Sequence, residues 1–149
     1  MKIRNGFVTN SSSSSFILGF TNQKSIAQDL LNDNTGRYYE RILSDCLNAE
    51  KMDLDTVLMR YRDEIESNVE LDMIGGYTWD EICELRKTKE YKDKLDELVD
   101  KKVEKLKKLA DGKNVFVEID YEDHSDDGAL LEHEIVPNLK SCLMRISWH

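Results

Sequence analysis

The residues best spaced for chemistry lie between Asp123 and Glu134, in the register of a calcium-binding loop. Oxygen ligands fall at loop positions 1, 3, 5 and 12, which are Asp123, Ser125, Asp127 and Glu134. Gly128 falls at position 6. Calcium takes about 6–8 oxygen ligands, which alternate side chains, a backbone carbonyl and a bidentate glutamate supply. Because serine replaces the usual acid at position 3, we expect weak binding, with a dissociation constant of about 10⁻⁴–10⁻³ M. A plain turn over residues 126–128 explains the same residues without a metal.

The three histidines offer an alternative metal site, because all of them fall near these carboxylates: His124, His133 and His149. Histidines and carboxylates together bind zinc and activate water, although the spacing here matches no named zinc motif. If the strands expected over 114–121 and 142–148 are parallel, His124 and His149 leave the sheet at the same end. If the strands are antiparallel neighbours, the two histidines lie at opposite ends, roughly 20 Å apart.

A run of five serines near the N-terminus offers hydroxyl and backbone N–H groups to an anion or a modifying enzyme: Ser11, Ser12, Ser13, Ser14 and Ser15. Backbone N–H groups in a turn form a nest that binds phosphate. The run lacks the glycine and lysine pattern of a P-loop. A flexible polar connection between two strands explains the run without a ligand, and we expect the loop to be mobile and dispensable for folding.

Residues 4–17 resemble a segment of known proteins. The segment reads Arg-Asn-Gly-Phe-Val-Thr-Asn, the five serines, and Phe-Ile. It resembles the opening of uncharacterised proteins of bacteria and their phages, which share the pattern F-V-[ST]-N-S-S-S-S-S-F. The resemblance covers under a tenth of the chain and implies no activity, but it favours a phage or mobile-element origin.

Charge is the strongest feature of the composition. The net charge of the 149 residues is −9, and residues 51–100 carry fifteen acidic against eight basic side chains. Such a surface repels phosphate backbones, so we expect no direct nucleic-acid binding, and it suits a partner protein with a basic surface. We expect Asp63, Glu64 and Glu66 to contact that partner.

No complete catalytic motif accompanies this charge. The chain has no G-x-S-x-G nucleophile elbow and no cysteine beside a histidine. We therefore expect a small acidic interaction protein, phage-associated, that binds and modulates or inhibits a host protein, as an anti-defence factor or a nucleic-acid mimic. A divalent-metal-binding protein or metal-dependent hydrolase, using residues 120–134 and the histidines, is the alternative. Weak Ca²⁺ is the expected cofactor of that alternative, ahead of Zn²⁺.

The hydropathy pattern indicates an α+β fold in a single domain over residues 1–149. We expect a sheet of four or five strands contributed by both ends of the chain, from residues 3–8, 16–20, 114–121 and 142–148, with a weaker signal at 69–73. A mainly helical insertion over residues 22–111 covers one face. Its cleanest helix places Leu54, Val57, Leu58, Tyr61 and Ile65 on one side.

Capping residues indicate where the helices of the second half of this insertion begin and end. Thr78 begins a capping box with Glu81, and one helix, or two with a break near Thr88, then extends to Gly112. The cysteines, Cys46, Cys83 and Cys142, form no paired motif, so we expect reduced, buried thiols. With no signal peptide and no apolar run of membrane-spanning length, we expect a cytoplasmic protein that does not enter the membrane.

Overall fold

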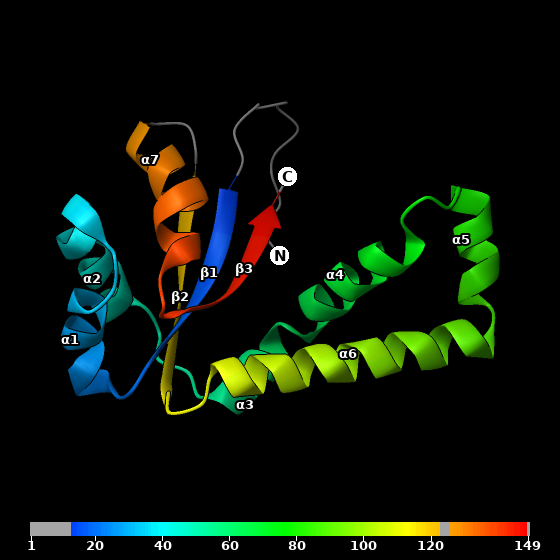
Figure 1. The fold of residues 1–149 in the computed structure, drawn as a ribbon, viewed down its shortest axis with the longest axis horizontal. Coiled ribbons are helices and arrows are strands. Elements are labelled where there is room, and N and C mark those ends of the chain that lie inside the picture. The colour runs from blue at the N-terminus through cyan, green and yellow to red at the C-terminus, as the bar shows by residue number, and fades with distance from the viewer. Residues whose placement is uncertain (1–12, 123–125, 149) are drawn as a thin grey trace. The chain divides into compact units, whose positions relative to one another are not determined.

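The computed structural model describes residues 13–122 and 126–148, and their contacts divide the chain into two compact units. Unit 1 comprises Met1–Leu54 and Gly112–His149, and unit 2 comprises Asp55–Asp111. Two compact units need not fold separately, so the expectation of a single domain stays a prediction. The mixture of helices and strands agrees with the expected α+β class (Figure 1).

The sheet of unit 1 has its N-terminal strand in the middle. The strands are β1 (Ser13–Phe20), β2 (Val115–Glu122) and β3 (Cys142–Trp148), in the order β2-β1-β3. Because β1 is antiparallel to both neighbours, β2 and β3 run parallel to each other. The expectation of four or five strands is therefore wrong for the described residues, which form three. The strand expected over residues 3–8 lies outside the described residues.

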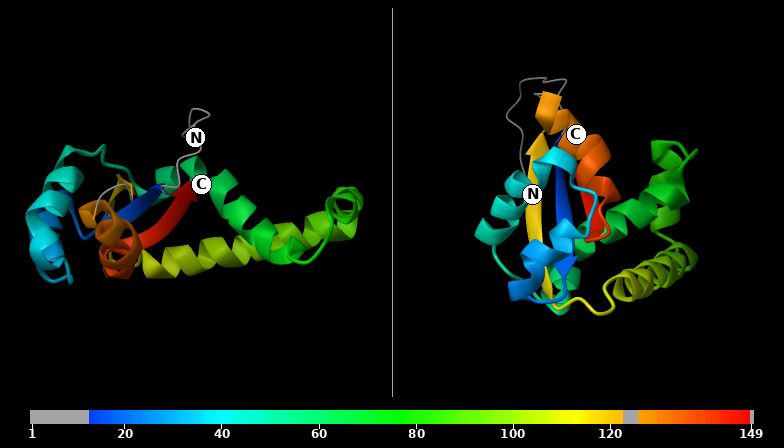
Figure 2. Two further views of the ribbon diagram at one scale, coloured as in Figure 1. Left: turned by 90° about the horizontal axis from the view of Figure 1, so that it is seen from above. Right: turned by 60° about the vertical axis from the view of Figure 1, so that its left-hand side comes forward.

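Helices cover one face of this sheet and form the core of unit 1 with it (Figures 1 and 2). They are α1 (Ile26–Leu31), α2 (Tyr39–Asn48) and α7 (Asp126–Leu130), with short 3-10 turns at Gln23–Ser25 and Gly36–Tyr38. Alternate residues of β1 and β2 point toward them, because side chains alternate between the faces of a strand. The core residues are Phe16, Leu18, Phe20, Ile26, Leu30, Tyr38, Ile42, Cys46, Val117, Ile119, Tyr121, Leu131, Val136 and Leu139.

The connection from β2 to β3 is helical for most of its length. A π-helical turn at Leu131–Ile135 and a 3-10 turn at Val136–Asn138 follow α7. Leu131 and Val136 of this crossover are buried and pack in the core with residues of β1 and β2. This crossover is thus part of the core of unit 1.

Unit 2 is a set of helices: α3 (Leu54–Arg60, of which the first residue belongs to unit 1), α4 (Arg62–Ile74), α5 (Trp79–Arg86) and α6 (Lys89–Leu109). Helix α4 packs along α6, with Ile65, Leu95 and Val99 among the buried side chains (Figure 1). The oxygens of Thr78 and Thr88 accept hydrogen bonds from the backbone N–H groups of Glu81 and Tyr91, at 3.3 and 3.2 Å. Both expected boundaries, the cap at Thr78 and the break near Thr88, are confirmed.

Two local expectations for this unit are wrong. The helix expected over Leu54–Ile65 is divided at Tyr61 into α3 and α4. The alternating residues 69–73, expected as a strand, belong to α4. None of the helices in the described part of the chain is both long enough and apolar enough to cross a bilayer.

Candidate functional site

A groove runs along one side of α4 in unit 2. It has a volume of about 500 Å³ and is lined by α4 and by one side chain of α5: Asp63, Glu66, Ser67, Glu70, Leu71, Ile74 and Arg86. The α4 residues are spaced by three and four positions, which places them on one face of a helix. Residues of the opposite side, such as Ile65, are buried, so packing against α6 fixes which face α4 presents. We call this feature the α4 groove.

The groove is acidic at one end and apolar at the other. Asp63, Glu66 and Glu70 follow one another along the helix, and Leu71 and Ile74 complete the lining toward its C-terminus. Three carboxylates against one guanidinium give the lining two more negative than positive charges. A concave site of mixed apolar and acidic character suits a ligand with a cationic head and an apolar body.

Arg86 connects the groove to an exposed aromatic side chain. Its guanidinium is paired with Glu70 and lies over the ring of Trp79, 5.6 Å from the ring centre. The hydrogen bond to Glu70 raises the pKa of Arg86, so this side chain stays charged. Burial raises the pKa of Tyr91, and the neighbouring charge of Glu70 raises it further. Arg86 therefore fixes the Glu70 carboxylate and leaves the other two acids of the groove for a ligand.

Large apolar side chains are exposed around the connection between α4 and α5. Leu71 is 63% exposed, Tyr77 49% and Trp79 67%. Leu71 lines the groove and Trp79 contacts its Arg86, so the exposed apolar surface continues from the groove. Exposed apolar side chains beside a groove are typical of protein-binding surfaces.

The structure brings together two of the three residues expected to contact a partner. Asp63 and Glu66 line the α4 groove, whereas Glu64 does not. Sequence reasoning missed Glu70 and Arg86. The spacing of Asp63, Glu66 and Glu70 on a helix was the available signal, and the strand expected over residues 69–73 concealed it.

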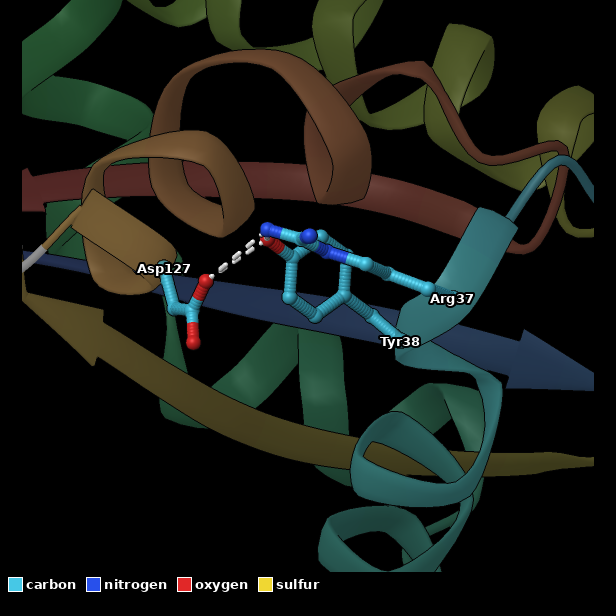
Figure 3. A network of polar contacts seen from close by, with 3 residues as sticks. All are labelled: Arg37, Tyr38 and Asp127. Carbon is cyan, nitrogen blue, oxygen red and sulfur yellow. Dashed lines mark hydrogen bonds and ion pairs between the residues drawn. The ribbon is translucent and has the colours of Figure 1, made fainter.

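Asp127, expected as a calcium ligand, binds protein side chains instead (Figure 3). Its Oδ1 accepts hydrogen bonds from the hydroxyl of Tyr38 at 2.8 Å and from the guanidinium of Arg37 at 3.2 Å. Arg37 also donates to the Tyr38 hydroxyl at 2.8 Å. Asp127 thus joins α7 to the turn before α2, and a metal at this carboxylate competes with Arg37.

Only some of the other expected metal ligands lie among the described residues. Asp123, His124, Ser125 and His149 lie outside the described residues. Gly128, expected at the sharp turn of a calcium loop, lies within α7, and Glu134 is an exposed residue of the π-helical turn. His133 Nε2 lies 3.6 Å from Glu132 Oε2. Among the described residues, no three histidines, cysteines or acids are grouped closely enough to hold a metal ion.

The sheet topology shows whether the strands that precede His124 and His149 are parallel or antiparallel. The ends of β2 and β3 lie at the same end of the sheet, because Ser13 pairs with both Glu122 and Trp148. Of the two arrangements considered from the sequence, the parallel one is therefore present. The strands that precede His124 and His149 therefore run in the same direction, one on either side of β1.

Three of the five serines are buried in β1, so the expectation of a mobile loop is wrong for them. Ser13, Ser14 and Ser15 are each at most 2% exposed. Ser14 donates to Glu132 Oε1 at 2.9 Å and accepts a hydrogen bond from Arg145 Nε at 3.2 Å, while Ser15 donates to Asp120. Anion binding or modification at the run stays a prediction, and Ser11 and Ser12 lie outside the described residues.

No family model, curated protein or solved structure matches this chain. The assignment of function therefore depends on the geometry of the α4 groove and on the residues of the sequence.

Proposed function

We propose that this protein is a non-enzymatic interaction protein that binds a basic segment of another protein in the α4 groove. The supporting observation is the groove itself, in which Asp63, Glu66 and Glu70 precede Leu71 and Ile74 on one helical face. An amphipathic helix with lysine or arginine toward one end and apolar residues toward the other complements this order. Charge complementarity gives such a complex its fast association and its specificity.

The chemistry of the groove also suggests how binding modulates the partner. Basic surfaces of proteins commonly hold phosphate groups of nucleic acids, and a carboxylate surface competes for them. With the phage-like segment at residues 4–17, this makes a host protein with a basic surface the proposed target, and inhibition the proposed effect.

The test uses a synthetic helical peptide that carries arginines and leucines on one face, with a fluorescent label. We expect binding that weakens as salt rises, because salt screens the charges. Glu66→Lys should weaken binding by about tenfold or more, since it replaces an attraction with a repulsion inside the groove. Asp72→Lys is the matched control, because Asp72 is an exposed acid of α4 outside the groove. Equal affinities for the native protein and both variants would contradict the proposal.

A divalent-metal site near residues 120–134 is the second candidate. The common direction of β2 and β3 favours it, whereas the engagement of Asp127 by Arg37 and Tyr38 opposes it. If calcium binds with the expected affinity, a few millimolar should stabilise the native state by about 1–2 kcal/mol. Thermal melts with calcium, zinc or a chelator test this, with Asp123→Ala and Glu134→Gln expected to abolish a calcium shift. A zinc shift lost on replacing the histidines would select the hydrolase, and no shift with either metal removes this candidate.

A further inference from the structure

One exposed side of α6 carries six charged residues that line a shallow groove of about 460 Å³: Glu97, Asp100, Lys101, Glu104, Lys105 and Lys108. All six are exposed, and their spacing places them on one side of the helix. Leu95, Val99 and Leu106, on the other side, are buried. We call these six residues the α6 stripe.

The order of charges in the α6 stripe is complementary to itself when reversed. A second copy laid antiparallel, with its two-fold axis between residues 102 and 103, places Glu97 opposite Lys108. The same axis places Asp100 opposite Lys105, and Lys101 opposite Glu104. Every facing pair therefore has opposite charges, and the symmetry repeats each pair.

The parallel alternative is unfavourable. Two copies aligned in register and parallel would place each charged residue opposite its own equivalent, and like charges repel. A two-fold axis makes the same patch contact itself, which is the arrangement found in most soluble homodimers. The charge order thus favours the antiparallel arrangement.

We propose that two copies of this chain associate antiparallel through the α6 stripe. The partner surface is a second copy, because the charges of the stripe are complementary to themselves when reversed. This inference concerns a different surface from the α4 groove and does not depend on the proposed function.

The association should be weak and sensitive to salt. Glu97 already pairs with Lys101 at 3.1 Å, and Glu104 pairs with Lys107 at 3.6 Å, within one helix. Intermolecular pairs add to these exposed pairs, and each changes an equilibrium constant by about 1.5- to 5-fold. Six charged residues without an apolar centre therefore give a reversible dimer rather than a permanent one.

Sedimentation equilibrium of the full chain, over a range of concentrations and from about 50 mM to about 1 M salt, measures this association. We expect a dimer at low salt that dissociates as salt rises. Lys108→Glu converts two attractions of the dimer into repulsions, so it should weaken association by about tenfold or more. Glu97→Lys combined with Lys108→Glu exchanges the two charges and should restore the dimer.

Lys92→Glu is the matched control. It changes the net charge as Lys108→Glu does, but helical residues turn by about 100° each, so exposed Lys92 faces away from the stripe. Circular dichroism establishes that each variant is folded, and Lys108→Gln replaces Lys108→Glu if the latter is not. A native protein that stays monomeric at every concentration overturns the proposal. A dimer that the Lys108 variants leave unchanged overturns it as well, and so does a double variant that associates as weakly as Lys108→Glu.

Discussion

Glu132 is a completely buried carboxylate, and two strands of the sheet supply a hydrogen-bond donor and an opposite charge to it. Ser14 of β1 donates to it at 2.9 Å, and an Arg145 guanidinium nitrogen of β3 lies 3.8 Å from the same oxygen. Arg145 also lies over the ring of Phe16, with 5.9 Å to the ring centre. A buried charge is tolerated only where polar groups and an opposite charge surround it. The serine run therefore contributes to the fold of unit 1 through Ser14.

The first prediction follows from this contact. Ser14→Ala removes a donor from a buried carboxylate, which should lower the free energy of unfolding by about 1–3 kcal/mol. Ser44→Ala is the control, because Ser44 is exposed on α2 and such changes stay within about 0.5 kcal/mol. Urea unfolding measures both. Equal stability of the two variants would show that Ser14 is dispensable, as a mobile loop residue would be.

Protonated side chains that are buried, such as Cys46 and Tyr121, or half-buried, such as Cys142, predict how stability depends on pH. Burial raises the pKa of the Cys46 thiol to about 12 and that of Cys142 to about 11, and it raises the pKa of Tyr121 as well. A thiol in the unfolded chain has a pKa near 8.5, so between that pH and the folded pKa the native state holds more protons. The stabilising contribution is therefore complete below pH about 8.5 and is lost as pH rises toward about 11–12.

Thermal melts from about pH 7 to about pH 11 measure this dependence. We expect the melting temperature to fall over the upper half of the range. Cys46→Ala should decline less steeply than the native protein, because it lacks one of these protonated groups. If the melting temperatures of the two proteins fall equally steeply with pH, the pKa of Cys46 is the same in the folded and the unfolded chain.

Local signals in the sequence predicted helix boundaries but did not predict the type of every element. The caps at Thr78 and Thr88 depend on residues three positions away, so the sequence contains the whole interaction. Residues 69–73 alternate as a strand does, yet helix α4 continues through them. Packing of α4 along α6 overrides the alternation, as tertiary context often does.

The cap at Thr88 should contribute measurably to stability. Thr88→Ala removes the acceptor for the Tyr91 N–H and should lower the free energy of unfolding by about 1 kcal/mol. Thr88→Ser keeps a hydroxyl at the cap and should retain most of the stability. Chemical unfolding followed by circular dichroism compares the three proteins. Equal losses for serine and alanine would show that the threonine methyl group, rather than the cap, is responsible.

The sequence predicted a helical insertion between strands but did not predict the order of the strands in the sheet. β1 lies between β2 and β3, and its pairs join residues more than ninety positions apart in the chain. The same holds for Ser14 and Glu132, which are 118 positions apart. Without a comparison to related proteins, no local pattern indicates which distant residues meet. For this reason the sequence predicted a polar loop at the serines that the structure buries in β1.

The last prediction is that both units unfold in one transition. Unit 2 is inserted between β1 and β2, so if it melted alone, two paired strands would be joined by a flexible loop of about 60 residues. Closing such a loop costs about 4 kcal/mol, a large part of the 5–15 kcal/mol that stabilises a typical domain. Leu30→Ala in unit 1 and Leu95→Ala in unit 2 each truncate a buried leucine, so each should lower stability by about 2–5 kcal/mol. Urea unfolding followed by circular dichroism and by hydrogen exchange of the β1 amides should give one midpoint for each variant. If Leu95→Ala melts in two steps while β1 stays protected through the first, the units are separate domains.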